Sequence, residues 1–516
     1  MGAVLGLVCG IIVTGDGLSF AAMLAGAALL DRLVRPRPSS PFAPAGRSRA
    51  GTALNLTIVA AACGAMLALS GSVPVSIVLT LALVCLLVLI SNAKHAVLGE
   101  PLVFSDFALF GAVFQHPQFY LSAIPLWQRV AVCLGLAGLL AVLWALFVPE
   151  PWPHVAGTAL LAGALALLAL LVRSGSVRGL AREPDAHADV LRHGLLPTLL
   201  LYLLRWRESR DPPPAQPVAG HPQLHDAPAP ELIVVVQCES FADPVELFGE
   251  PSLALPALEA ARAAAAQWGR LHVSGFGAYT MRTEYGVLFG RGEAALGFRR
   301  YDPFLTALGE ASYALPARLA GAGWRSLFVH PHDMRFYGRD RIMPAGGFAE
   351  LVGEEHFAAR PAGGPRYVPD AEVAERILAL ARAAREPTLL YAVTIENHGP
   401  WAPTGSAAPG RAQSADLLAS YLRLVRNSDA MLETLIAGLG TTGRPALLVF
   451  FGDHRPSIPG VTAPGGERHT PYVMLRLDGH GAVSPADNRP ADLTPADLHH
   501  VILRTVLGDH ASPPTR

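Results

Sequence analysis

The sequence predicts a multi-span α-helical membrane domain followed by an α/β domain in which helices flank a sheet. Two observations carry this prediction. Long apolar runs without internal charges crowd the chain before about residue 175, and apolar strands alternate with helical patterns after residue 231. Hydrophobic residues make up 51% and charged residues 16% of the 516 residues, and the mean hydropathy is +0.36. An ordinary soluble protein of this length carries more charge.

The apolar runs of the first part approach the roughly 20 residues that a helix needs to cross a bilayer. Buried core helices of a large soluble domain are the alternative, but four or five such runs in succession disfavour it. A cleaved signal peptide would explain only the first run, which Gly15, Asp16 and Gly17 interrupt. About five spanning helices are expected, over 1–30, Thr52–Leu69, Pro74–Ile90, Val130–Val148 and Val155–Val172.

Three other segments connect or follow these runs. Lys94–Tyr120 is mixed and aromatic, which indicates an interfacial segment, and Leu195–Leu204 is too short to cross and is expected at the membrane surface. Residues 208–230 are rich in Pro and Ala and predict a semi-rigid spacer. The expected organisation is a transmembrane domain at 1–175, an interfacial segment and linker at 176–230, and a catalytic domain at 231–516.

The net charge argues against a nucleic-acid partner, and the cysteine positions exclude an internal disulfide in the polar half. The net charge is -1, so nothing indicates a nucleic-acid partner. Four of the five cysteines lie in apolar runs, and only Cys238 lies in the polar half. The polar half therefore cannot form an internal disulfide.

The second part alternates short apolar strands with amphipathic helices. This order predicts a parallel sheet with helices on both faces. The expected strands are Leu232–Gln237, Ser326–His330, Leu389–Ile395 and Ala446–Phe451, and the expected helices include Leu253–Trp268 and Asp370–Arg385.

Polar residues follow these strands at the edge where an α/β sheet binds its ligands. The strand ends deliver a glutamate (Glu239), an aspartate–histidine pair (Asp453 and His454) and two further histidines (His398 and His330). Carboxylate and imidazole together suit a divalent metal such as manganese or zinc. The alternative for each residue is an ordinary turn or a helix N-cap.

The motifs around these residues form a more specific set. They are Val-Val-Gln-Cys-Glu-Ser-Phe around Glu239, Thr-Met-Arg-Thr-Glu-Tyr from Thr280, Glu-Asn-His-Gly-Pro-Trp around His398, Phe-Gly-Asp-His ending at His454, and His330 followed by Phe336–Asp340. In this order the chain resembles the lipoteichoic acid synthases of the alkaline phosphatase and sulfatase superfamily. The resemblance covers nearly the whole chain and implies a mixed sheet flanked by helices.

The resemblance also implies roles for individual residues. Thr280, with Glu284 four residues later, matches the nucleophile motif. Tyr337 stands where the family usually has a tryptophan. The implied cofactor is one divalent ion, Mn²⁺ with Mg²⁺ or Zn²⁺ as alternatives. The expected metal ligands are Glu239, Thr280, Asp453 and His454, the expected catalytic residues are Thr280 and His398, and the expected substrate-binding residues are His330, Tyr337, Arg339 and His469.

Plain structural explanations stand beside three of these roles. Thr280 follows a Gly-rich approach and could be the N-cap of a helix. His398 could be a strand-end histidine bonded to its own loop. Arg339 could form a surface ion pair with Asp340 or Asp333.

The implied reaction moves a phosphoglycerol-type or phosphoethanolamine headgroup from a phosphatidylglycerol-like lipid to an envelope glycan or polymer, through phospho-Thr280. The alternatives are a phosphodiesterase or other phosphate- or sulfate-ester hydrolase, and a membrane scaffold without activity. Sulfate-ester hydrolysis is disfavoured, because sulfatases need a Cys-x-Pro-x-Arg type motif and the sequence around Cys238 lacks it.

The distribution of arginines conflicts with the membrane orientation that the resemblance implies. The resemblance implies a multi-pass protein of the cell membrane with its catalytic domain facing the periplasm or exterior. Cytoplasmic loops are normally the positive ones. However, an odd number of spans with an inside N-terminus would place outside the first loop, which holds Arg32, Arg35, Arg37, Arg47 and Arg49.

Overall fold

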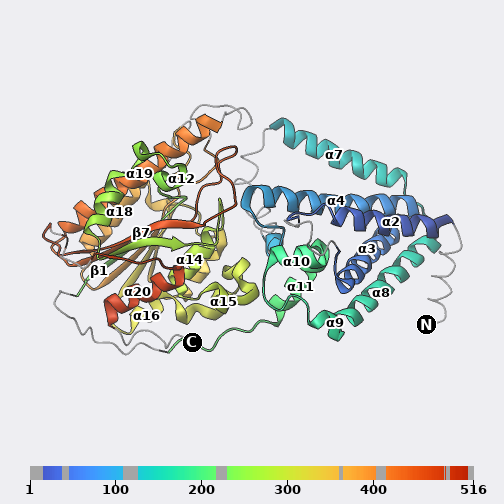
Figure 1. The fold of residues 1–516 in the computed structure, drawn as a ribbon, viewed down its shortest axis with the longest axis horizontal. Helices are drawn as coiled ribbons and strands as arrows, with labels where there is room; N and C mark the ends of the chain where they lie inside the picture. Colours follow the sequence, from blue (N-terminus) through green and yellow to red (C-terminus); the bar gives the residue numbers. More distant parts are fainter. Residues whose placement is uncertain are drawn as a thin grey trace. The chain divides into compact units, whose positions relative to one another are not determined.

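The computed structural model describes residues 15–37, 46–108, 126–216, 229–359, 364–401, 414–481, 483 and 488–508. The chain divides into two compact units, Met1–Ser209 and Arg210–Arg516. The first is helical and the second is built around a sheet (Figure 1). Parts of the first apolar run, of the expected interfacial segment and of the Pro-rich spacer lie outside the described residues, namely 1–14, 109–120 and 217–228.

Three helices of the first unit are long and apolar enough to cross a membrane: α3, α4 and α8. Two shorter apolar stretches, Gly17–Asp31 in α2 and Cys133–Ala145 in α7, lie in the regions where further spans are expected. The described helices are α2 (Gly15–Asp31), α3 (Arg49–Ser70), α4 (Val73–Leu98), α7 (Leu126–Ala145), α8 (Pro151–Arg173), α9 (Gly175–Arg178), α10 (Ala186–His193) and α11 (Leu195–Glu208).

Close helix packing and one partly buried arginine hold this unit together. α3 and α8 approach so closely that a Cβ added to Gly157 would lie 2.3 Å from the Ala68 nitrogen. Arg47, just before α3, pairs with Asp31 at the end of α2 (Nε to Oδ2, 2.8 Å). It also donates to the carbonyl oxygens of Val190 and Leu191 in α10. The loop between α2 and α3 is thereby fastened to the segment that follows α8.

The second unit holds one eight-stranded sheet in the order β4-β3-β5-β1-β6-β7-β2-β8. β4, β3, β5, β1 and β6 run parallel, and β7 is antiparallel to both β6 and β2. The sheet is therefore mixed, as the resemblance implies, and the alternation of strands and helices alone overstates its parallel character. The strands are β1 (Leu232–Cys238), β2 (Gln267–His272), β3 (Arg325–Val329), β4 (Glu350–Val352), β5 (Thr388–Val393), β6 (Ala446–Gly452), β7 (His469–Leu477) and β8 (Arg489–Pro490).

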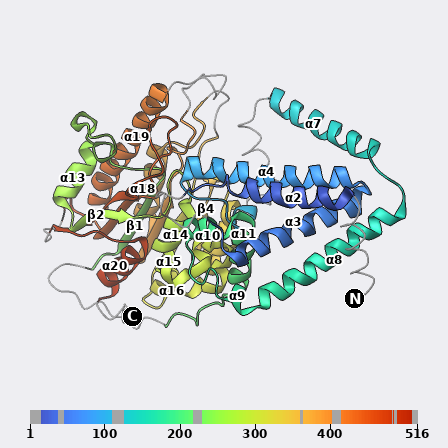
Figure 2. The same ribbon diagram turned by 45° about the vertical axis from the view of Figure 1, so that its right-hand side comes forward.

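Helices cover both faces of the sheet (Figures 1 and 2). α13, α18 and α19 pack an apolar core against one face, and α14, α16 and α20 lie on the other. The expected helix Leu253–Trp268 is too long, because Gln267 and Trp268 belong to β2, which pairs with β7. The helices are α12 (Pro244–Phe248), α13 (Pro256–Ala264), α14 (Thr280–Phe289), α15 (Glu293–Leu296), α16 (Leu315–Ala320), α17 (Arg339–Ala345), α18 (Asp370–Ala383), α19 (Ser414–Gly440) and α20 (Pro495–Leu507), with 3-10 turns η1 (Pro251–Leu253), η2 (Gly297–Tyr301), η3 (Pro303–Tyr313), η4 (Phe336–Gly338) and η5 (Glu354–His356).

Candidate metal and nucleophile site

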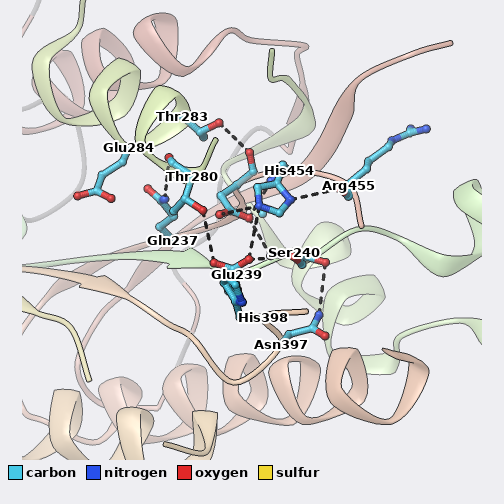
Figure 3. A network of polar contacts seen from close by, with 12 residues as sticks. Gln237, Glu239, Ser240, Thr280, Thr283, Glu284, Asn397, His398, His454 and Arg455 are labelled. Atoms are coloured by element: carbon cyan, nitrogen blue, oxygen red, sulfur yellow. Dashed lines mark hydrogen bonds and ion pairs between the residues drawn. The ribbon is translucent and has the colours of Figure 1, made fainter. Parts of the chain in front are cut away.

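Two neighbouring parallel strands bring three metal-ligand residues together. β1 leads into Glu239, and β6 leads into Asp453 and His454. One ligand atom from each residue lies within 4.8 Å of the others, and all three side chains are buried. Figure 3 shows Glu239 and His454 converging beside Thr280 and Ser240.

Backbone groups orient the Asp453 carboxylate. Its Oδ1 accepts hydrogen bonds from the backbone nitrogens of Ser240 and His454, each at 2.8 Å. Its Oδ2 is buried without a hydrogen-bond partner in the described part of the chain, and lies 3.6 Å from His454 Nε2. A buried carboxylate oxygen without a partner is costly, so this atom fits a metal ligand.

The Glu239 carboxylate lies against the same cluster. Oε1 accepts from Ser240 Oγ at 2.9 Å and lies 3.4 Å from His454 Nε2. Burial, followed by the negative charge of Asp453, raises the pKa of Glu239 to about 8. Two carboxylates buried this closely favour a cation between them.

The imidazole of His454 is held in a tautomer that suits a ligand. Nδ1 lies 3.2 Å from the Arg455 carbonyl oxygen, which can only accept. Nδ1 therefore carries the proton, and the Nε2 lone pair faces Glu239 and Asp453. The donor set of carboxylate, imidazole and hydroxyl fits one divalent ion, with Glu239, Asp453, His454 and Thr280 as the residues able to hold it.

Thr280 is the first residue of α14, and its hydroxyl donates to Glu239 Oε2 at 3.5 Å. The N-cap of α14 is Tyr279, without a side-chain capping bond. The alternative that Thr280 caps the helix is therefore wrong. One turn later, the Thr283 hydroxyl donates to the Asp453 carbonyl oxygen at 2.7 Å. This bond fixes α14 to the segment after β6 that carries Asp453 and His454.

Left-handed backbone conformations accompany the site. Ser240, directly after Glu239, has φ 49°, Tyr279, directly before Thr280, has φ 78°, and Tyr337 has φ 61°. Residues other than glycine rarely adopt such values, and they concentrate at functional sites because the surrounding structure must hold them. Here two of them place the side chains that meet at the cluster.

Arg339 lies on the Glu284 side of α14 and is 1% exposed. It forms a two-point ion pair with Glu284, from Nε to Oε1 at 3.0 Å and from Nη2 to Oε2 at 2.6 Å. Asp333 instead pairs with Arg335. The alternative of a surface ion pair between Arg339 and Asp340 or Asp333 is therefore wrong.

His330 completes this buried group. Its Nδ1 donates to the Val393 carbonyl oxygen at 2.9 Å, and its Nε2 accepts from Arg339 Nη1 at 3.3 Å. Burial, followed by the charge of Arg339, lowers the pKa of His330 well below its usual range, so the ring is neutral. Tyr337 lies beside the same guanidinium, 5.1 Å from the carbon to the ring centre.

The other two predicted residues are not part of the group formed by Glu239, Asp453 and His454. His398 is exposed in the loop after β5, and its ring lies 5.7 Å from that of Tyr367. His469, at the start of β7, bonds to Glu246 Oε2 at 2.8 Å and contacts Arg455. Neither histidine belongs to the compact ligand group found among the described residues.

Several supporting residues escaped prediction. Ser240, Thr283 and Asn397 act through contacts with distant segments, such as the bond from Asn397 Nδ2 to the Ser240 carbonyl oxygen at 3.3 Å. The pairing of Glu284 with Arg339 was not predicted either. The four-residue spacing from Thr280 indicates only that Glu284 and Thr280 lie on one helix face.

Comparisons with known proteins agree with the fold. The sulfatase family model matches residues 231–503. The capsular polysaccharide biosynthesis protein RkpI of Rhizobium meliloti (strain 1021) is 32% identical over 430 residues, which cover 79% of this chain and 78% of that protein. The lipooligosaccharide phosphoethanolamine transferase A of Neisseria meningitidis has a similar fold, with a TM-score of 0.52 at 15% identity over 90% of this chain and 96% of that one.

Removing one carboxylate should remove the metal. We expect Asp453→Ala to lose bound divalent ion, because the unpartnered Oδ2 disappears, while Asp340→Ala, at an exposed position, retains it. Elemental analysis of the purified variants measures both. Equal metal content in Asp453→Ala and the wild type would rule out this site.

The metal-free protein should lose stability as pH rises. Folded Glu239 keeps its proton up to about pH 8, whereas the ordinary pKa is 4.5, so between these values the folded state binds more protons than the unfolded state. Chelator-treated protein is therefore expected to melt at a lower temperature at pH 8 than at pH 5.5. Glu239→Gln should flatten this dependence, and an unchanged slope in that variant would contradict the assignment.

Proposed function

The chain belongs to the sulfatase family of the alkaline phosphatase superfamily, and we propose that it transfers a phosphoglycerol-type or phosphoethanolamine headgroup from a membrane lipid to a cell-envelope glycan or polymer. The observation that carries the proposal is the Thr280 hydroxyl, presented at a helix start against a buried carboxylate cluster. The relative RkpI is named for capsular polysaccharide biosynthesis, which favours a glycan acceptor.

In the first step, Thr280 Oγ attacks the phosphorus of the lipid. The bond from phosphorus to the diacylglycerol oxygen breaks, and diacylglycerol leaves once that oxygen gains a proton. Glu239 Oε2 is the acceptor that faces the Thr280 proton. Negative charge on the transferred group gathers at the N-terminus of the ten-residue helix α14, where the positive end of the helix dipole favours it.

In the second step, an acceptor hydroxyl attacks the same phosphorus. The bond to Thr280 Oγ breaks, and the threonine recovers its proton. His398, exposed after β5, is the proposed donor of the proton to the departing diacylglycerol and the acceptor of the proton from the incoming hydroxyl.

The proposed cofactor is Mn²⁺, with Mg²⁺ or Zn²⁺ as alternatives, held by Glu239, Asp453, His454 and Thr280. Such an ion supplies a Lewis acid that lowers the pKa of a bound hydroxyl and neutralises phosphoryl charge. The protein contributes the geometry: Ser240 and the backbone of His454 hold the Asp453 carboxylate, and Asp453 keeps one oxygen directed at the site.

Arg339 and Tyr337 form the proposed headgroup side of the site. Glu284 and His330 fix the guanidinium, and because Glu284 cancels its charge, a headgroup there would be recognised by directed hydrogen bonds more than by net charge. His469, which contacts Arg455, remains a proposed substrate-binding residue.

Two other functions are less well supported. A phosphodiesterase would use the same residues with water as acceptor. Sulfate-ester hydrolysis through an oxidised cysteine is disfavoured, because Cys238 is buried in β1 and burial raises the pKa of its thiol.

We propose a multi-pass membrane protein with its catalytic domain outside the cytoplasm. Arg47 fastens the first loop to α10, so this loop and the segment leading into the catalytic domain share one membrane face. Arg47 also pairs with Asp31, so its charge serves these contacts within the unit. Arg47 is therefore not an argument for a cytoplasmic first loop.

Substitution of the nucleophile tests the reaction. Full-length protein is incubated with manganese, a glycan acceptor and labelled phosphatidylglycerol or phosphatidylethanolamine. Thr280→Ala should lower turnover by on the order of 10³-fold or more, because a covalent route has no substitute for its nucleophile. Thr280→Ser should keep part of the activity, and Thr306→Ala, outside the site, should behave as the wild type.

The products separate the alternatives. Diacylglycerol with label on the acceptor indicates a transferase, and free headgroup phosphate indicates a hydrolase. Near-normal turnover by Thr280→Ala would refute the mechanism, and absence of any product with each metal would favour a scaffold.

A further inference from the structure

A cavity of about 500 Å³ opens beside α14. Its floor is the face of α14 that carries Arg282, Thr283 and Gly286, and its walls come from α15 and the start of α20. The volume lies within the range of small-molecule sites. Figure 2 shows these helices together on one face of the sheet.

The arginines that line this cavity are already engaged. Arg300 pairs with Glu293 at the rim, and Arg291 Nε lies 2.5 Å from Glu310 Oε2. Both members of the Arg300–Glu293 pair remain about one-third exposed. A phosphate site would instead offer guanidinium groups without acidic partners.

Arg282 is engaged by aromatic residues. Its guanidinium lies 3.8 Å from the centre of the Tyr279 ring, and its Nε donates to the Tyr301 carbonyl oxygen at 3.2 Å. The cavity therefore combines a mostly apolar lining with hydrogen-bonding groups, and two of its three arginines are paired with carboxylates. Neighbouring hydroxyl groups, each a donor and an acceptor, match such a surface.

The cavity is coupled to the reaction centre through α14. Thr283 lines it and lies one turn from Thr280, about 4.5 Å along the helix axis. The Tyr279 ring under Arg282 belongs to the residue directly before Thr280. A Cβ added to Gly286 would lie 2.5 Å from Pro495 Cβ, so α14 and α20 are in close contact at the cavity floor.

We propose that this cavity binds a neutral sugar residue of the acceptor glycan and so holds the polymer beside Thr280. That the sugar belongs to the acceptor rests on the proposed function, whereas sugar binding itself requires no turnover. The site is separate from the headgroup side, because Thr283 and Gly286 line the cavity whereas Glu284 contacts Arg339.

Filling the rim tests the proposal without removing a charge. Ala294 is exposed and lines the cavity, and Ala295 is its exposed neighbour in α15 but does not line it. Full-length protein in a detergent without a sugar headgroup is titrated calorimetrically with a neutral β-linked glucose tetrasaccharide. Ala294→Trp should weaken binding at least tenfold, while Ala295→Trp should bind as the wild type.

The same titration in the Thr280→Ala background should give the wild-type affinity, which separates this proposal from the proposed reaction. If Ala294→Trp lowers the melting temperature, Glu293→Gln takes its place, because it removes one acceptor at the rim without changing volume, and is expected to weaken binding as well. Unchanged binding in these variants, or no binding by the wild type, would overturn the proposal. It would also be overturned if Ala294→Trp weakened the binding of glycerol phosphate instead, since the cavity would then be a phosphate site.

Discussion

Two carboxylates buried side by side at the edge of the sheet are the constraint on which the second unit depends. Glu239 and Asp453 share this place with only one imidazole, and Asp453 Oδ2 has no partner among the described residues. Burying unpaired charge costs several kcal/mol per ion by the usual order of magnitude. We propose that a bound cation offsets this cost and that the uncommon backbone conformations of Ser240 and Tyr279 position its ligands.

α14 joins the separate parts of the site. Its first residue presents the hydroxyl, Thr283 ties it to the metal-ligand loop, and Glu284 holds Arg339. The Glu284–Arg339 pair is almost wholly buried, and breaking such a pair from one side costs about 3–5 kcal/mol. The pair therefore fixes the proposed headgroup side relative to Thr280, while the face of the helix that carries Arg282 and Gly286 lines the cavity.

Local pattern was sufficient to predict that Glu239, Asp453 and His454 lie together, because each apolar strand ends directly before the polar residue that it positions. Glu239, Asp453 and His454 all follow this rule. The partner of Arg339 was not accessible in this way, since Glu284 lies 55 positions away and the contact exists only after folding. For the same reason the Ala-rich stretch before Trp268 resembled one long helix, although pairing with β7 converts its end into β2. Hydropathy located the helices of the first unit, while the contact between Arg47 and α10 required the fold.

The most direct test of the central claim is peptide mass spectrometry after brief exposure of the full-length, manganese-loaded protein to donor lipid without an acceptor. The account predicts a single adduct on the peptide that contains Thr280, with the mass of the transferred phosphoglycerol or phosphoethanolamine group, and predicts its disappearance once an acceptor glycan is added. Release of diacylglycerol with an unmodified Thr280, or an adduct at any other residue, would contradict it.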